Sequence, residues 1–97
     1  MNGNGQTGSP AVHRVVNHRM LAMLRAVAAG RARVSCSSEP DLFIDGLSCG
    51  DQFAAHALAH DGLIRGVRPG LPGELVQAIL TPDGEAIITE KQQHHAA

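Results

Sequence analysis

Two histidines, His56 and His60, are four positions apart in a stretch rich in alanine and leucine. On a helix such residues share a face, so both imidazole rings could reach one metal ion, with Cys36, Cys49 or Asp61 completing the set. The chain contains no CxxC motif, however, and the pair lacks the glutamate of a zincin-type helix. Because alanine-rich helices acquire such pairs by chance, we expect neither a metal site nor any other cofactor.

The two cysteines, Cys36 and Cys49, are thirteen positions apart. If a hairpin brings them together, they could form a redox switch. Alternatively, Cys36 is a small core residue, and Cys49 lies in the first turn of a helix, where a thiolate is favoured. The sequence has no Ser-His-Asp arrangement, no glycine-rich phosphate loop and no carboxylate pair in a suitable setting. We therefore expect a protein that is not an enzyme.

The stretch from Leu47 to Glu90 contains the elements that would position most of these side chains. A helix is expected from Ser48 to Asp61, with Ser48 as the N-cap and Asp51 completing a capping box. Gly62 supplies the left-handed conformation in which helices commonly end. The outward positions of this helix are expected to be Gln52, Ala55, His56, Ala59 and His60.

After this helix, the sequence predicts a two-stranded ribbon and a further helix. Leu63-Ile64 begins an extended run that turns at Pro69–Gly73 and returns as Leu75–Leu80. The helix starts at Thr81-Pro82, because threonine is a good cap and proline suits the first turn. A rival interpretation makes the segment from Thr81 a turn that leads into a strand at Glu85–Thr89. The helix is preferred because these residues show little alternation.

The N-terminal part is expected to form a tail and one long helix. Residues 1–8 are rich in glycine, asparagine and glutamine and predict a disordered tail. A helix follows from about Pro10 to Ala29, with Ser9 as its cap. Its apolar side chains cover more than one stripe, so we expect a homodimer in which Val15 and Met23 meet a symmetry mate. The alternative is that the helix simply exposes spare apolar residues.

Between these parts the pattern changes to that of strands. Ala32, Val34 and Cys36 alternate with polar residues, as in a half-buried strand. Leu42–Ile44 is a second short run of β-forming residues, closed by Asp45-Gly46. We expect a small β-hairpin here, or one strand followed by a tight loop.

The order of elements from Leu47 to Glu90 resembles the back half of a winged helix-turn-helix domain. The resemblance is carried by HDGLIRG and LVQAILTPDGE, which are similar to the GLI … LT-x-x-G shape of bacterial transcriptional regulators. It implies an α+β fold, with a single winged-helix-like domain over residues 9–90 and a frayed tail over 91–97. That domain would contain a long N-terminal helix, a short β-hairpin, a recognition-type helix, a two-stranded wing and a C-terminal helix.

The same resemblance implies a dimeric transcriptional regulator that binds double-stranded DNA. Arginines beside the helices and in the wing would contact phosphates, while glutamine and histidine on the recognition helix would face base edges. The expected DNA-binding residues are Arg31, Arg33, Gln52, His56, Arg65 and Arg68.

Composition favours a competing hypothesis. The formal net charge is −1, from 8 basic and 9 acidic residues, whereas nucleic-acid binders usually show a basic footprint. The alternative function is a non-catalytic protein–protein interaction module on the same scaffold, and a thiol- or metal-sensing regulator ranks third. If the four arginines lie on the same face as Gln52 and His56, the DNA-binding hypothesis is favoured. If they lie on different faces, the interaction-module hypothesis is favoured.

Length and cysteine content suggest one small domain in a reducing compartment. Two cysteines do not make a disulfide framework. No apolar run approaches the ~18–20 residues needed to span a membrane, and the N-terminus lacks the layout of a signal peptide. We therefore expect a cytoplasmic protein.

Overall fold

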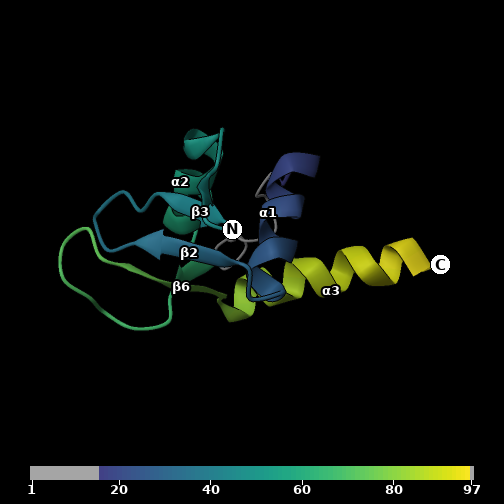
Figure 1. Cartoon of the computed structure of the whole chain (residues 1–97). Coiled ribbons are helices and arrows are strands. Elements are labelled where there is room, and N and C mark those ends of the chain that lie inside the picture. The colour runs from purple at the N-terminus through teal and green to yellow at the C-terminus, as the bar shows by residue number, and fades with distance from the viewer. Residues whose placement is uncertain (1–15, 97) are drawn as a thin grey trace, which may run out of the picture.

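The structure is a computed structural model in which residues 16–96 are described, with side chains described for residues 16–91. This part of the chain is an α+β domain with three helices and a five-stranded antiparallel sheet (Figure 1). The elements in chain order are α1 (His18–Ala28), β2 (Ala32–Ser35), β3 (Leu42–Ile44), β4 (Leu47–Ser48), α2 (Gln52–His60), β5 (Ile64–Gly66), β6 (Leu75–Leu80) and α3 (Pro82–Ala96). The predicted α+β class is confirmed.

The strands lie in the order β4-β3-β2-β6-β5, so the predicted hairpin and the predicted ribbon belong to one sheet. In the central strand, Arg33 pairs with Phe43 of β3 on one side and with Gln77 of β6 on the other. Successive residues of a strand point to opposite faces. Val34 and Val76, which neighbour this row, are accordingly buried, while Arg33 and Gln77 are exposed. The sheet therefore has an inner face in the core and an outer face that carries the Arg33 row.

All three helices contribute to the core on the inner face. α1 contacts β2 and β6, α2 contacts β3 and β5, and α3 contacts β6. The largest fully buried side chains are Leu24, Leu42, Leu58 and Leu63. Met23 belongs to the same cluster and is 5% exposed, so its predicted role at a dimer interface is wrong. Val15 lies outside the described residues, and the homodimer itself stays a prediction.

The first helix starts later than predicted. Asn17 has an extended backbone, and its side chain accepts a hydrogen bond from the Met20 N–H at 2.8 Å, so that α1 begins at His18. Asparagine is among the strongest N-caps, and it sets the start of α1 at His18. Apolar spacing alone had predicted a start near Pro10. The predicted cap at Ser9 lies outside the described residues.

The second helix also starts later, at Gln52 rather than Ser48. Asp51 is the N-cap, and its carboxylate accepts a hydrogen bond from the Ala54 N–H at 2.9 Å. Ser48 instead pairs with Phe43 in the β3–β4 hairpin. Asp45 and the glycine after it have φ values of 54° and 83°, which suit the two-residue turn that such a hairpin requires.

The third helix begins where it was predicted. The Thr81 hydroxyl accepts a hydrogen bond from the Gly84 N–H and donates one to the Gly62 carbonyl. The rival strand at Glu85–Thr89 is therefore wrong, because these residues are helical. α3 runs on to Ala96, past the expected start of the frayed tail, and leads away from the sheet (Figure 1). None of the helices in the described part of the chain is long and apolar enough to cross a bilayer.

Candidate functional site

Gln52, a predicted base-reading residue, is turned into the fold. Its Oε1 accepts from the Leu42 N–H at 2.9 Å, and its Nε2 donates to the Leu42 and Cys49 carbonyls at 2.9 and 3.0 Å. The amide thus adds to the backbone pairing at the start of β3, where the Leu42 carbonyl also accepts from the Cys49 N–H at 3.0 Å. Its polar atoms are satisfied within the protein, so the predicted outward position of Gln52 is wrong.

His56 is likewise engaged by the protein itself. Its Nε2 lies 2.9 Å from Asp41 Oδ1, and its Nδ1 lies 3.2 Å from Glu39 Oε1. His60 Nε2 approaches the same Glu39 carboxylate at 3.4 Å. These contacts join α2 to the loop between β2 and β3. Although the two histidines share a helix face as expected, the described residues contain no group of three or more His, Cys, Asp or Glu side chains arranged to hold a metal ion.

Of the predicted outward positions of α2, only His60 is exposed, Gln52, His56 and Ala59 are half-buried, and Ala55 is buried. Ala55 is 1% exposed, because the side of α2 that carries it faces the core and not solvent. The side chain that α2 presents most openly to solvent is Phe53, at 86% exposure. A helix in this orientation offers little chemistry for reading base edges.

The predicted arginines divide into paired and unpaired groups. Arg31 donates two hydrogen bonds to Asp45, at 2.8 and 3.1 Å, and these hold the pKa of that carboxyl below its usual value. Arg68 donates to Glu74 at 2.7 Å and likewise lowers the pKa of Glu74. Arg33 and Arg65 form no ion pair with a carboxylate of the described residues, although the Arg65 guanidinium donates to the Gly66 carbonyl.

An exposed surface on the outer face of the sheet brings some of these arginines together with apolar side chains. We define the outer sheet surface by Arg33, Phe43, Val67, Leu75 and Gln77. The first, second and last of these form one cross-strand row, and the Val67 N–H donates to the Gln77 carbonyl at 2.8 Å. Together they line an open hollow of about 850 Å³. Val67 and Leu75 are 48% and 39% exposed, so apolar side chains are open to solvent at this hollow.

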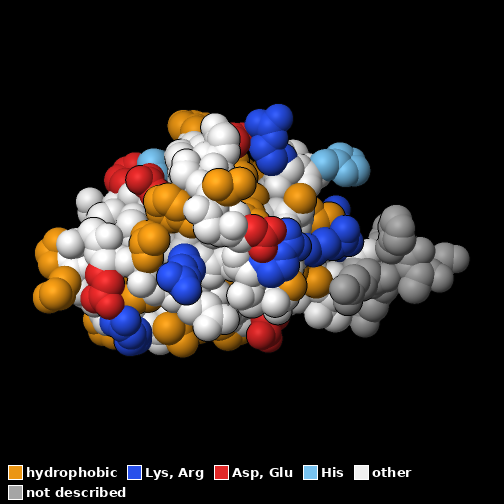
Figure 2. All heavy atoms as spheres, viewed as in Figure 1, with side chains coloured by type: hydrophobic (Ala, Val, Ile, Leu, Met, Phe, Trp, Pro, Cys, Tyr) orange, Lys and Arg blue, Asp and Glu red, His pale blue; other side chains and the backbone are white. Residues whose placement is uncertain are grey.

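Charge on the outer sheet surface is mixed. Arg31, Arg33, Arg68 and Asp45 line the hollow, and Arg65 points the same way because it pairs with the outward Ile79. Figure 2 shows separate groups of basic side chains between hydrophobic and acidic ones, rather than a continuous basic band. The predicted arginines are thus close to one another but not to Gln52 and His56, which belong to α2.

The loop predicted as a wing is folded back onto β2. The Glu74 carbonyl accepts from the Cys36 N–H at 2.8 Å, and the Gly73 N–H donates to the Cys36 carbonyl at 2.9 Å. Glu74 also holds Arg68 and accepts from the Leu71 N–H at 2.9 Å. The loop is therefore tied at its base instead of reaching freely into solvent.

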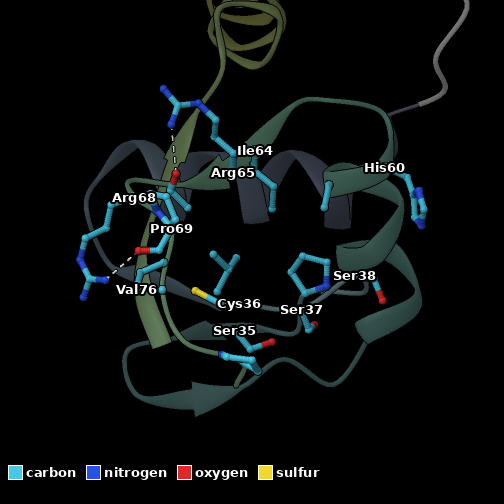
Figure 3. A pocket seen from close by; sticks show the side chains of 16 residues that line it. Ser35, Cys36, Ser37, Ser38, His60, Ile64, Arg65, Arg68, Pro69 and Val76 are labelled. Atoms are coloured by element: carbon cyan, nitrogen blue, oxygen red, sulfur yellow. Dashed lines mark hydrogen bonds between the residues drawn. The ribbon is translucent and has the colours of Figure 1, made fainter. Parts of the chain in front are cut away.

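The two cysteines occupy different places, and both are free thiols. Cys36 is half-buried, and its sulfur points into a second hollow on the inner side of the sheet (Figure 3). Cys49 precedes α2 instead of lying in its first turn. Burial raises the pKa of the Cys49 thiol, and the charge of Asp51 adds to this, so the predicted thiolate stabilisation is wrong.

The sequence did not point to Phe43, Leu75 or Gln77 as functional residues. Alternation in LVQAIL could have identified the outward set, since Val76 and Ala78 are buried between Leu75, Gln77 and Ile79. Alternation alone could not show which face of the sheet is left uncovered by the other described elements.

No family model matches the chain, and no similar curated protein or solved structure was found. Function is therefore inferred from the geometry described above.

Proposed function

We propose that this chain is a non-catalytic protein-binding module on a winged-helix-like scaffold, and that its outer sheet surface binds an acidic, apolar segment of a partner protein. The observation that carries this proposal is that the exposed Val67 and Leu75 and the half-buried Phe43 line one hollow together with Arg33. Protein interfaces are enriched in aromatic side chains and arginine, and exposed apolar patches commonly mark them.

The strand arrangement supports the winged-helix-like scaffold. β2, which follows the first helix, lies next to β6, and β6 pairs with β5, so the ribbon is extended by an earlier strand. α2 directly precedes that ribbon, as a recognition-type helix would. On this proposal, the β3–β4 hairpin would take the place of the second helix of a helix-turn-helix.

Charge supports the choice of an acidic partner segment. Three arginines and one aspartate line the hollow, and since Arg31 pairs with Asp45 and Arg68 with Glu74, the charge of Arg33 is left unbalanced. Among them, Arg33 has no carboxylate partner in the described residues, so it is the cation most available to an incoming carboxylate. Complementary charges of this kind raise association rates and select the partner.

The test is a selection of peptides from a random displayed library on the purified protein. We expect the enriched peptides to combine Asp or Glu with Leu or Phe. Phe43→Ser and Arg33→Gln should each weaken their binding at least about fivefold, because truncation of a central anchor costs at least ~1 kcal/mol. Circular dichroism and thermal melting would confirm that the variants fold.

Phe53→Ser is the matched control, because it removes an equally large and more exposed ring from α2, away from the outer sheet surface. It should leave the binding unchanged. Enriched peptides without acidic residues, or equal losses in Phe43→Ser and Phe53→Ser, would contradict the proposal.

The second candidate function is that of a DNA-binding transcriptional regulator. It is supported by Arg33 and Arg65, which point outward without carboxylate partners among the described residues. Against it stand the engaged polar atoms of Gln52 and His56 and the ion pair of Arg68. DNA binding would then depend on the arginines alone and not on Phe43, so the same two variants separate the two functions.

A further inference from the structure

A hollow of about 450 Å³ lies on the opposite side of the sheet from the outer sheet surface. Its floor is formed by inward-facing side chains of the strands, and its walls by the loop after β5, the loop between β2 and β3, and the end of α2 (Figure 3). Its apolar lining includes Val34, Cys36, Pro40, Ala59, Ile64 and Val76.

The charged side chains at this hollow point away from it. Figure 3 shows the Arg65 and Arg68 guanidinium groups and the His60 ring directed outward, while the Cys36 sulfur points inward. Hydrogen bonds explain these orientations, since Arg65 donates to the Gly66 carbonyl and Arg68 donates to the Pro69 carbonyl. A charged ligand would therefore lose its hydration without gaining a partner inside the hollow.

The walls are held in place by contacts that do not depend on a ligand. On one side, Gly73 and Glu74 are hydrogen-bonded to the backbone of Cys36. On the other, the Glu39 carboxylate contacts both His56 and His60 and fixes the β2–β3 loop against α2. A hollow with fixed walls can bind a ligand without the cost of ordering loops.

We propose that this hollow binds a small neutral, apolar molecule about the size of a two-ring aromatic compound. Its volume lies within the ~300–1,000 Å³ range of ligand pockets, and its lining is mostly apolar with a few serine hydroxyls at the rim. This site is separate from the outer sheet surface, so either proposal can fail without affecting the other.

The two cysteines provide a test in the wild-type protein. Three naphthalene probes of similar size differ in charge: 2-naphthalenemethanol is neutral, 2-naphthoate is an anion and 2-naphthylmethylamine is a cation. The rate at which N-ethylmaleimide alkylates each cysteine is measured by peptide mass spectrometry with and without each probe. Cys49 is the internal control, because it lies between α1 and β3 and not at this hollow.

We expect the neutral probe to slow alkylation of Cys36 about tenfold at ten times its dissociation constant, by mass action, and to leave Cys49 unchanged. The charged probes should protect Cys36 far less at the same concentration. Equal slowing of both cysteines, no protection by the neutral probe, or equal protection by the charged probes would overturn the proposal.

A variant that fills the hollow gives a second measurement. Ala59→Leu places a larger side chain at its wall, and Ala86→Leu makes the same change at an exposed position of α3. With the neutral probe followed by its own fluorescence, Ala59→Leu should weaken binding at least several-fold and Ala86→Leu should not. Unchanged binding in a folded Ala59→Leu variant would overturn the assigned site.

Discussion

At the scale of residues, several polar side chains that could have faced a ligand serve the fold instead. Gln52 completes the hydrogen bonding of β3, and Asp51 caps α2 while it holds Arg19 at 2.8 Å. Both side chains have a clear energetic role, because backbone groups left without a partner are costly when they are removed from water. These roles can be tested independently of any ligand.

Gln52→Ala removes three hydrogen bonds to backbone groups of Leu42 and Cys49. We expect it to lower the free energy of unfolding by about 1–3 kcal/mol, because the Leu42 N–H loses its partner in a part-buried place, while the Leu42 carbonyl keeps only the bond from the Cys49 N–H. In a domain of this size each 1 kcal/mol corresponds to a fall in Tm of about 4–8 °C. Gln77→Ala, at an exposed position of β6, is the control, and an equal loss in both variants would contradict the assigned role.

The pKa of Asp51 lies below its ordinary value of 3.8, chiefly because the Ala54 N–H and then the Arg19 guanidinium donate to its carboxylate. A lowered folded-state pKa contributes stability that is present above the ordinary pKa and lost as the pH falls below it. Asp51→Asn keeps a good cap but does not titrate.

Denaturation of both proteins should therefore show that wild type is the more stable at about pH 7 and that the difference shrinks as the pH falls to about 3. Asp45 and Glu74 titrate in both proteins, so the comparison isolates Asp51. A difference that is constant with pH would contradict the assigned role of this carboxylate.

At the scale of elements, the sequence predicted the ends of α1 and α2 better than their starts, whereas for α3 it predicted the start and not the end. Alternation located β2, and glycines at 30 and 62 end α1 and α2 with φ values of 79° and 72°. The starts were missed because Ser48 and Asp51 are both good caps, and spacing alone cannot choose between them. The choice is made by the β3–β4 hairpin, which uses Ser48 in the sheet.

The candidate surface depended on tertiary structure in the same way. Alternation alone could identify the side chains of β6 that point outward. The residues of β2 and β3 that lie beside them are known only from the strand order. Arg33 lies between Phe43 and Gln77 because β2 is inserted between the hairpin and the ribbon. A pairing across more than forty residues could not be derived from local patterns.

Gly84 illustrates a constraint between elements. A Cβ at this position would lie 2.2 Å from the Leu63 carbonyl oxygen, so only glycine lets α3 approach the start of β5 this closely. Alanine is the better helix former by about 1 kcal/mol, yet we expect Gly84→Ala to lower the Tm because the backbone must shift. Glu85→Ala, at an exposed position in the same turn, should have little effect. A higher Tm for Gly84→Ala would show that the packing is looser than described.

At the scale of the whole molecule, half of the arginines in the described residues are paired with carboxylates. Three of the six arginines in the described residues form ion pairs with carboxylates, and the net charge of the chain is −1. Such a charge distribution gives phosphate backbones little to bind, whereas a surface that combines apolar and basic side chains suits a protein partner.

If DNA is bound, Arg33 and Arg65 should provide most of the salt dependence. Arg33→Gln with Arg65→Gln should reduce the slope of log affinity against log salt by about 0.9 for each phosphate that these side chains no longer neutralise. Arg25→Gln, an exposed arginine on α1, is the matched control. A fluorescence titration with random duplex DNA at low salt measures this. An equal effect of the control, or no binding at about 100 μM DNA, would remove DNA binding from consideration.

The most direct test of the protein-binding proposal is a nuclear magnetic resonance titration of the labelled chain with a selected acidic, apolar peptide. We predict that the amide resonances of Arg33, Phe43 and Gln77 shift together with increasing peptide, while that of Phe53 stays in place. Shifts centred on α2, with the β2, β3 and β6 resonances unchanged, would contradict the assignment of the binding function to the outer sheet surface.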